Sequence, residues 1–147
     1  MVYVVAAYHD LGMSGPRAIH HITSGKILMA DARLKRWFSQ DQIKIMKEAV
    51  EDHRASSSRQ PRSIYGKIVA EADRDIDTHE IFLRAILYAK ENNPGKDKEQ
   101  IWELFAHHMD EKYSVHGYIK LWIPNSPNEK ELKMPVSYTH LTLPTNR

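Results

Sequence analysis

The apolar residues of one stretch recur at the spacing of a single buried helix face, at positions Ile43, Met46, Val50 and, last, His53. Ser39 is followed three residues later by Gln42, which is the capping-box pattern that begins a helix. Segment 54–62 is polar and serine-rich and contains Pro61, which predicts a loop. The chain therefore contains an amphipathic helix whose buried face ends on a histidine.

Helical patterns of this kind follow one another along most of the chain. They predict helices over residues 2–11, 18–32, 39–53, 63–73, 78–93 and 97–113, and a short one from 126 toward 134. Leu34, Trp37 and Phe38 add a turn or two, Thr78 is the expected cap of its helix, and 118–123 fits a strand or a helix. Gly66 and Ala70 predict close packing of their helix. We expect an all-α bundle of six or seven helices.

Composition limits the class of protein. The 147 residues predict one domain, and 41% hydrophobic residues suffice for a modest core. No apolar stretch of spanning length and no signal-peptide pattern is present, and the chain has no cysteine. We therefore expect a cytoplasmic protein that does not enter a membrane. A net charge of +2 gives no reason to expect specific nucleic-acid binding.

Two adjacent residues with metal-binding side chains follow the first apolar run. His9 and Asp10 come at the predicted end of the helix over 2–11, just before Gly12. Imidazole nitrogen and carboxylate oxygen together suit borderline metals such as manganese, iron, nickel or zinc. Alone, such a pair is more often a surface turn, so the prediction of a metal site depends on further ligands.

The rest of the chain supplies further ligand candidates. His53 ends one buried helix face, and Asp73 ends the apolar stretch 68–72, where a carboxylate is costly unless it is paired or bound to metal. His20 and His21 are a third point. Gly25 lies one helical turn after His21 and is expected to leave space beside that imidazole, so His21 is favoured over His20, which could serve instead.

The ordered set resembles the HD-domain phosphohydrolase superfamily, whose members hold metal in a helical bundle. His9-Asp10 matches the family's defining doublet, and Asp73, within Ala72-Asp73-Arg74-Asp75, matches its distant aspartate. His21 and His53 match the two histidines that members with two metals add between these points. The resemblance covers residues 1–134 and implies an HD-domain-like bundle.

The resemblance also implies an activity and roles for these residues. It implies a phosphohydrolase with one or two divalent ions of manganese, iron, nickel or zinc, acting on a phosphate ester or anhydride such as a nucleotide. Asp10 would hold or bridge the metals, with His9 and Asp73 on one ion and His21 and His53 on the other. Basic residues near the site are expected to bind substrate phosphate: Arg54, Arg62 and Lys67. The alternative is a helical module that binds a nucleotide or partner without turnover.

The two ends of the chain carry expectations of their own. The family's first histidine precedes the doublet, but only eight residues precede His9, so we expect the chain to begin inside its domain. The missing helix would expose apolar surface near Val2, Val4 and Val5 and favour a homo-oligomer. Residues 135–147 look like translated sequencing-adapter sequence, and we expect this tail to be disordered.

Overall fold

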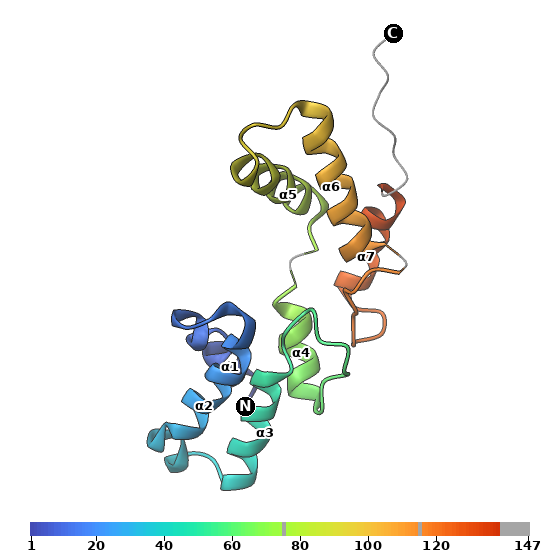
Figure 1. Cartoon of the computed structure of the whole chain (residues 1–147). Coiled ribbons are helices and arrows are strands. Elements are labelled where there is room, and N and C mark those ends of the chain that lie inside the picture. Colours follow the sequence, from blue (N-terminus) through green and yellow to red (C-terminus); the bar gives the residue numbers. More distant parts are fainter. Residues whose placement is uncertain (75, 115, 139–147) are drawn as a thin grey trace. The chain divides into compact units, whose positions relative to one another are not determined.

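The computed structural model describes residues 1–74, 76–114 and 116–138 (Figure 1). Within these residues the chain forms seven α-helices and three short 3-10 helices, and no strand. The predicted all-α fold is confirmed. Segment 118–123, which fitted either a strand or a helix, forms neither.

The chain divides into two compact units, Met1–Arg74 and Asp75–Arg147, where the sequence predicted a single domain over 1–134. The physical basis of this division is the presence of two separate clusters of buried apolar side chains. One is centred on Met46 and Val50, and the other on Phe105 and Met109. Each unit is described by itself below.

The first unit contains four α-helices, and the predicted metal ligands lie at or near the ends of these helices. Its elements are α1 (Val2–Tyr8), η1 (Leu11–Ser14), η2 (Arg17–Ile19), α2 (His20–Ala30), η3 (Ala32–Arg36), α3 (Gln40–Glu51) and α4 (Ile64–Ala72). The predicted first helix therefore ends earlier than expected, and a 3-10 turn follows it. Three short 3-10 helices fill the connections between the longer helices.

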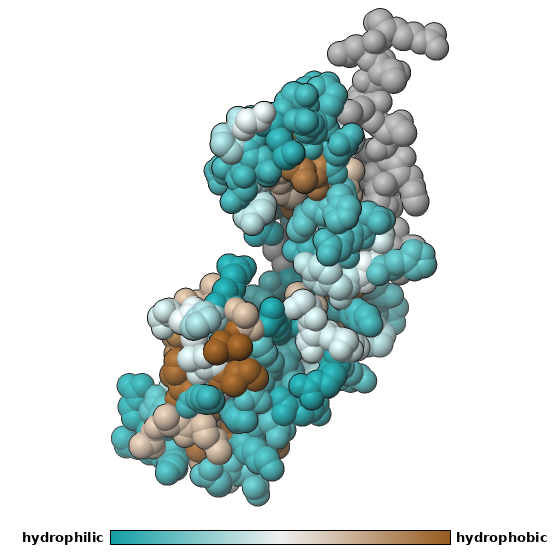
Figure 2. All heavy atoms as spheres, viewed as in Figure 1, coloured by the Kyte–Doolittle hydropathy of each residue, from teal (hydrophilic) through white to brown (hydrophobic). Residues whose placement is uncertain are grey.

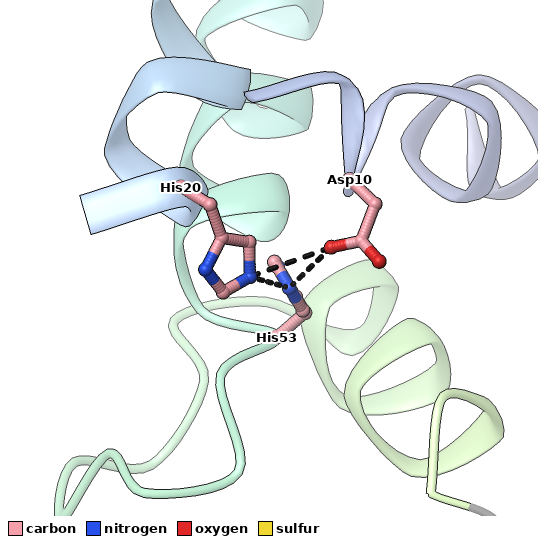
Figure 3. Close-up of side chains that lie close together, drawn as sticks. All are labelled: Asp10, His20 and His53. Carbon is pink, nitrogen blue, oxygen red and sulfur yellow. Dashed lines mark hydrogen bonds and ion pairs between the residues drawn. The ribbon is translucent and has the colours of Figure 1, made fainter. Parts of the chain in front are cut away.

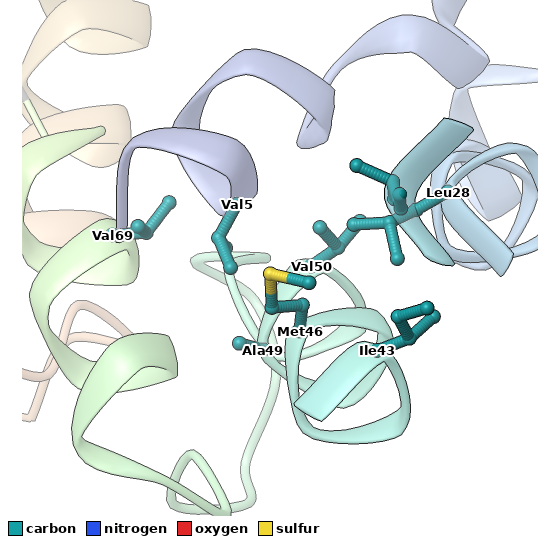
Figure 4. Close-up of a cluster of buried hydrophobic side chains, with 8 residues drawn as sticks. Val5, Leu28, Ile43, Met46, Ala49, Val50 and Val69 are labelled. Carbon is teal, nitrogen blue, oxygen red and sulfur yellow. The ribbon is translucent and has the colours of Figure 1, made fainter. Parts of the chain in front are cut away.

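Helix α3 is the centre of the first unit. Its buried face contributes Ile43, Met46, Ala49 and Val50, which pack with Val5 of α1, Leu28 of α2 and Val69 of α4 (Figure 4). The predicted capping box is present, because the Gln42 amide donates to Ser39 Oγ and the Ser39 amide donates to Gln42 Oε1. Two of the predicted capping residues thus fix where the central helix begins.

Two glycines let helices approach α3 closely. A methyl group on Gly66 of α4 would lie 3.4 Å from Ala49 Cα, which bears out the predicted close packing of this helix. A methyl group on Gly25 of α2 would lie 2.9 Å from the Glu51 side chain. The space beside Gly25 is thus filled by Glu51.

The second unit contains α5 (Thr78–Asn92), α6 (Lys98–Tyr113) and α7 (Pro127–Tyr138). Its cluster contains Ile81, Phe105, Met109 and Tyr113, with the Phe82 and Phe105 rings packed edge to face at 5.3 Å. Asp77, rather than the expected Thr78, caps α5 by accepting from the Glu80 amide.

Helix α7 also extends farther than the sequence suggested. It continues through 135–138, which were expected to begin a disordered tail, and residues 139–147 of that tail lie outside the described residues. Across the part of the chain that the structure describes, no helix combines the length and apolarity needed to cross a membrane.

Candidate metal centre

Side chains from the ends of four helices meet in the first unit. His9 follows α1, Asp10 precedes η1, His20 is the first residue of α2, and His53 follows α3. Asp73 is the residue directly after α4. The side chains of Asp10, His20 and His53 point toward one another (Figure 3).

One oxygen of Asp10 faces two imidazoles. Asp10 Oδ1 lies 3.4 Å from His20 Nε2 and 3.5 Å from His53 Nε2. The two Nε2 atoms are 3.0 Å apart. One carboxylate oxygen and two ring nitrogens therefore form a tight triangle of potential ligand atoms.

The second oxygen of Asp10 faces another pair of side chains. Asp10 Oδ2 lies 3.6 Å from His9 Nε2, which in turn lies 3.2 Å from Asp73 Oδ1. The rings of His9 and His53 are 5.1 Å apart and nearly perpendicular. Asp10 thus stands between two groups, with one oxygen toward each.

The three imidazoles share the same local hydrogen bond, to the carbonyl three residues earlier. His9 Nδ1 donates to Ala6 O at 2.7 Å, His20 Nδ1 to Arg17 O at 2.8 Å, and His53 Nδ1 to Val50 O at 2.6 Å. A carbonyl can only accept, so each Nδ1 carries a proton. In a neutral imidazole, Nε2 then has a free lone pair, and all three Nε2 atoms lie within 3.6 Å of a carboxylate oxygen.

This arrangement brings acceptor atoms against acceptor atoms. Carboxylate oxygens and unprotonated Nε2 atoms repel one another unless a proton or a cation lies between them. Two donors that bind one ion at about 2.0–2.2 Å, with angles of about 90–110°, lie about 2.8–3.6 Å apart. The distances within the Asp10, His20 and His53 triangle, 3.0 to 3.5 Å, fall in this range. The residues present therefore fit a transition-metal ion by both chemistry and spacing.

The centre is buried on one side and open on the other. The side chain of His53 is 2% exposed, whereas that of Asp10 is 51% exposed. Burial lowers the pKa of His53 below its ordinary value, against smaller raising effects from the bond to Val50 and from Asp73. A low pKa keeps this imidazole neutral and able to bind a metal near neutral pH, while solvent reaches Asp10.

A close backbone contact sets the position of Asp10 relative to His20. The Gly12 amide donates to the fully buried Ser24 hydroxyl at 2.8 Å. A methyl group on Gly12 would lie only 2.3 Å from the carbonyl oxygen of His20, so no larger residue fits there without movement. Gly12 thereby holds η1, and with it Asp10, against the start of α2.

The end of α1 is fixed by a polar contact. Tyr8 Oη donates to Asp31 Oδ2 at 2.5 Å, and Arg33 binds the same carboxylate through Nε and Nη2. These bonds, first from Arg33 and then from Tyr8, hold the pKa of Asp31 well below its usual range. Because Tyr8 directly precedes His9, this contact restrains the helix end that carries the first imidazole.

Of the predicted metal ligands, the structure brings His9, Asp10, His53 and Asp73 together and adds His20 in place of His21. The His21 ring lies 5.6 Å from the His20 ring, and its Nδ1 is buried without a hydrogen-bond partner among the described residues. Burial and the charge of Arg54 lower the pKa of His21. The reason for expecting His21 also fails, because Glu51 fills the space beside Gly25. In the sequence, the signal for His20 as a ligand was its place directly beside His21.

The three predicted phosphate-binding residues are placed differently. Arg62 binds Asp52 at 2.9 Å and Glu51 at 3.1 Å, so its charge is already neutralised. Arg54 donates from Nη1 to the carbonyl of Ala18, two residues before His20. Lys67 lies half-buried in the middle of α4. Arg54 and Arg62 thus both contact residues close in sequence to candidate ligands, but Arg62 is bound to carboxylates and Arg54 to a neutral carbonyl.

No protein-family model matches the chain, and neither a curated protein nor a solved structure is significantly similar to it.

Proposed function

We propose that this protein is a metal-dependent phosphohydrolase that cleaves a phosphate ester or anhydride, with a nucleotide as the expected substrate. The observation that carries the proposal is the convergence of three Nε2 atoms on the two oxygens of Asp10 and on Asp73, at 3.2 to 3.6 Å. The resemblance of His9-Asp10 and Asp73 to the HD-domain pattern supports the same chemistry.

The residues divide into two candidate ligand groups that share Asp10. His20 and His53 would hold one divalent ion with Asp10 Oδ1, and His9 and Asp73 would hold a second with Asp10 Oδ2. A bound manganese, iron, nickel or zinc ion supplies Lewis acidity, which activates water and offsets charge on phosphate oxygens. The group of Asp10, His20 and His53 is the more compact, so we infer one ion there. A second ion in the other group would make two.

The side chains around the centre have supporting roles. The exposed side of Asp10 gives water and substrate a path to the ligand groups. Arg54 holds the carbonyl of Ala18 through one nitrogen and retains other N–H donors, which suit phosphate oxygens. We therefore propose Arg54 as a phosphate-binding residue and leave out Arg62, whose donors bind Asp52 and Glu51.

Metal titration and turnover test this function. Apo protein is titrated with manganese, iron, nickel and zinc by calorimetry, and hydrolysis of p-nitrophenyl phosphate and of a nucleotide panel is measured with each metal. We expect at least one tightly bound ion per chain and turnover that depends on it. Asp10→Asn should reduce both by at least about tenfold, because the amide removes one charge and one acceptor. His79→Asn, an exposed histidine of the second unit, is the matched control.

A second candidate is a module that binds without turnover. It is favoured by the 3.0 Å separation of His20 and His53, which also fits a hydrogen bond between one imidazolium and one imidazole. In that case the chain would bind a nucleotide in the presence of a chelator, with no hydrolysis. Nucleotide affinity without bound metal or turnover would replace the phosphohydrolase proposal with this one.

A further inference from the structure

The second unit contains a cavity of about 570 Å³ between the end of α5 and the start of α6. Ile86, Ile101 and Trp102 line it with apolar surface, together with Pro94 of the connecting loop. Figure 2 shows apolar surface surrounded by hydrophilic residues in this part of the second unit. A cavity of this size is within the range that holds small ligands, and it is too small for a folded partner.

Three lysines line the same cavity: Lys90 of α5, Lys96 of the loop and Lys98 of α6. All three are exposed, and none forms an ion pair with a residue that the structure describes. Three ammonium groups that line one apolar cavity produce a positive potential there, and this potential attracts an anion.

The single carboxylate of the lining, Asp97, can offset one of the three lysine charges. Asp97 caps α6: its Oδ1 accepts from the Gln100 amide at 2.9 Å, and its own amide donates to Gln100 Oε1 at 3.1 Å. This capping box directs the carboxylate to the helix end. The lining therefore carries three positive groups and one negative group, so positive charge is in excess.

We propose that this cavity binds an amphiphilic anion, a small molecule with an apolar body and one carboxylate or phosphate group. The apolar body packs against Ile86, Ile101 and Trp102, and the head group lies among the lysines. A cation is repelled by the lysines, and a neutral amphiphile gains the apolar contact without the charge. The proposal is independent of the metal centre, which lies in the other unit.

Binding is tested on the full chain with four probes of equal chain length. Octanoate and octyl phosphate are titrated by calorimetry and by tryptophan emission, beside octanol and octyltrimethylammonium. We expect the two anions to bind one site with a dissociation constant on the order of 0.1 mM, and the other two at least about tenfold more weakly. The stronger of the two anions identifies the preferred head group. Trp102→Phe should remove the change in emission while calorimetry still detects binding, because Trp102 lines the cavity.

Charge variants separate this site from general apolar binding. The triple variant Lys90→Gln, Lys96→Gln, Lys98→Gln should weaken anion binding at least about tenfold, and high salt should do the same to the wild-type chain. The control replaces three exposed lysines of the first unit, Lys26, Lys35 and Lys44, by glutamine and should leave binding unchanged. Equal affinity for octanol and octanoate, unaltered binding by the first triple variant, or no saturable anion binding would overturn the proposal. If that variant fails to fold, the salt dependence decides.

Discussion

His20 and His21 are adjacent in sequence but have different surroundings. His20 Nε2 lies 3.4 Å from Asp10 Oδ1, whereas His21 lies outside the group of converging ligand atoms. We expect His20→Asn to weaken metal binding at least about tenfold and His21→Asn to change it less than about threefold, because only the first removes a nitrogen directed at Asp10. Calorimetric metal titration of both variants measures this. A larger loss from His21→Asn would restore the sequence-based assignment.

His53 makes stability depend on pH in a defined direction. Burial lowers its pKa in the folded chain, while the unfolded chain keeps the ordinary value near about 6.5. The unfolded state therefore binds more protons below that pH, and the free energy of unfolding falls as the solution is acidified. Above it, both states are neutral at this residue and the contribution is fully present.

A variant isolates this effect from other titrating groups. His53→Asn can still donate to the Val50 carbonyl but has no proton to gain. Urea unfolding in the presence of a chelator, from about pH 8 to about pH 5, should show a shallower loss of stability for the variant than for the wild type. Parallel curves for the two proteins would contradict the assignment to His53.

For single residues, the sequence predicted most of the side chains that meet at the candidate metal centre, but not all of them. His9, Asp10, His53 and Asp73 lie together, as the spacing and the resemblance suggested. The choice between His20 and His21 depends on where around its axis α2 faces the site, since neighbouring helical residues point about 100° apart. That rotation is set by the Gly12 contact with His20 and Ser24, which no local pattern reveals.

The contact between η1 and α2 gives a prediction for a whole element. Gly12→Ala should destabilise the first unit by about 1–3 kcal/mol, because its methyl group would lie 2.3 Å from the His20 carbonyl oxygen. Metal affinity should fall as well, since relief of this overlap moves Asp10 away from His20. Chemical unfolding and metal titration measure the two effects.

Gly15→Ala is the matched control for that substitution. Its methyl group would lie 3.6 Å from the Gly12 carbonyl oxygen, which is an ordinary contact. It should change stability by no more than about 0.5 kcal/mol. Similar losses from both variants would show that the Gly12 contact has no special role.

Helix boundaries were predictable where a cap has a local signature. Ser39 with Gln42 located the start of α3, and Ser63 accepts from the Gly66 amide at the start of α4. The 3-10 segments were not predicted over their observed bounds, because three to five residues carry too little periodicity. Asp77 and Thr78 are both good caps, and backbone geometry decides between them.

The two units give a prediction for the whole molecule. Phe105→Ala removes ring contacts with Phe82 and Trp102 and should cost the second unit about 3–5 kcal/mol. Met46→Ala should cost the first unit about 2–5 kcal/mol, because Met46 is fully buried in its cluster. Scanning calorimetry should show each variant lowering a different transition, and added metal should raise only the one that Met46→Ala lowers.

One shared transition, moved equally by both variants, would contradict independent units. The sequence did not predict this division because helical spacing shows which face of a helix is buried, not against which other helix it packs. Helix α6 buries Ile101, Phe105 and Met109 on one face, whereas Leu104, which shares their helical spacing, is exposed. Their grouping into a second cluster depends on contacts distant in sequence.

The backbone carbonyls that hold the three imidazoles have a consequence for how the site tolerates mutation. In many metal sites a carboxylate side chain orients each histidine, and its replacement weakens metal binding. Here the acceptors are the main-chain oxygens of Ala6, Arg17 and Val50, which every amino acid possesses. These positions can change identity without loss of ring orientation, provided that the local turn persists. Sequence variation at these three positions is thus limited by backbone conformation, and not by side-chain chemistry.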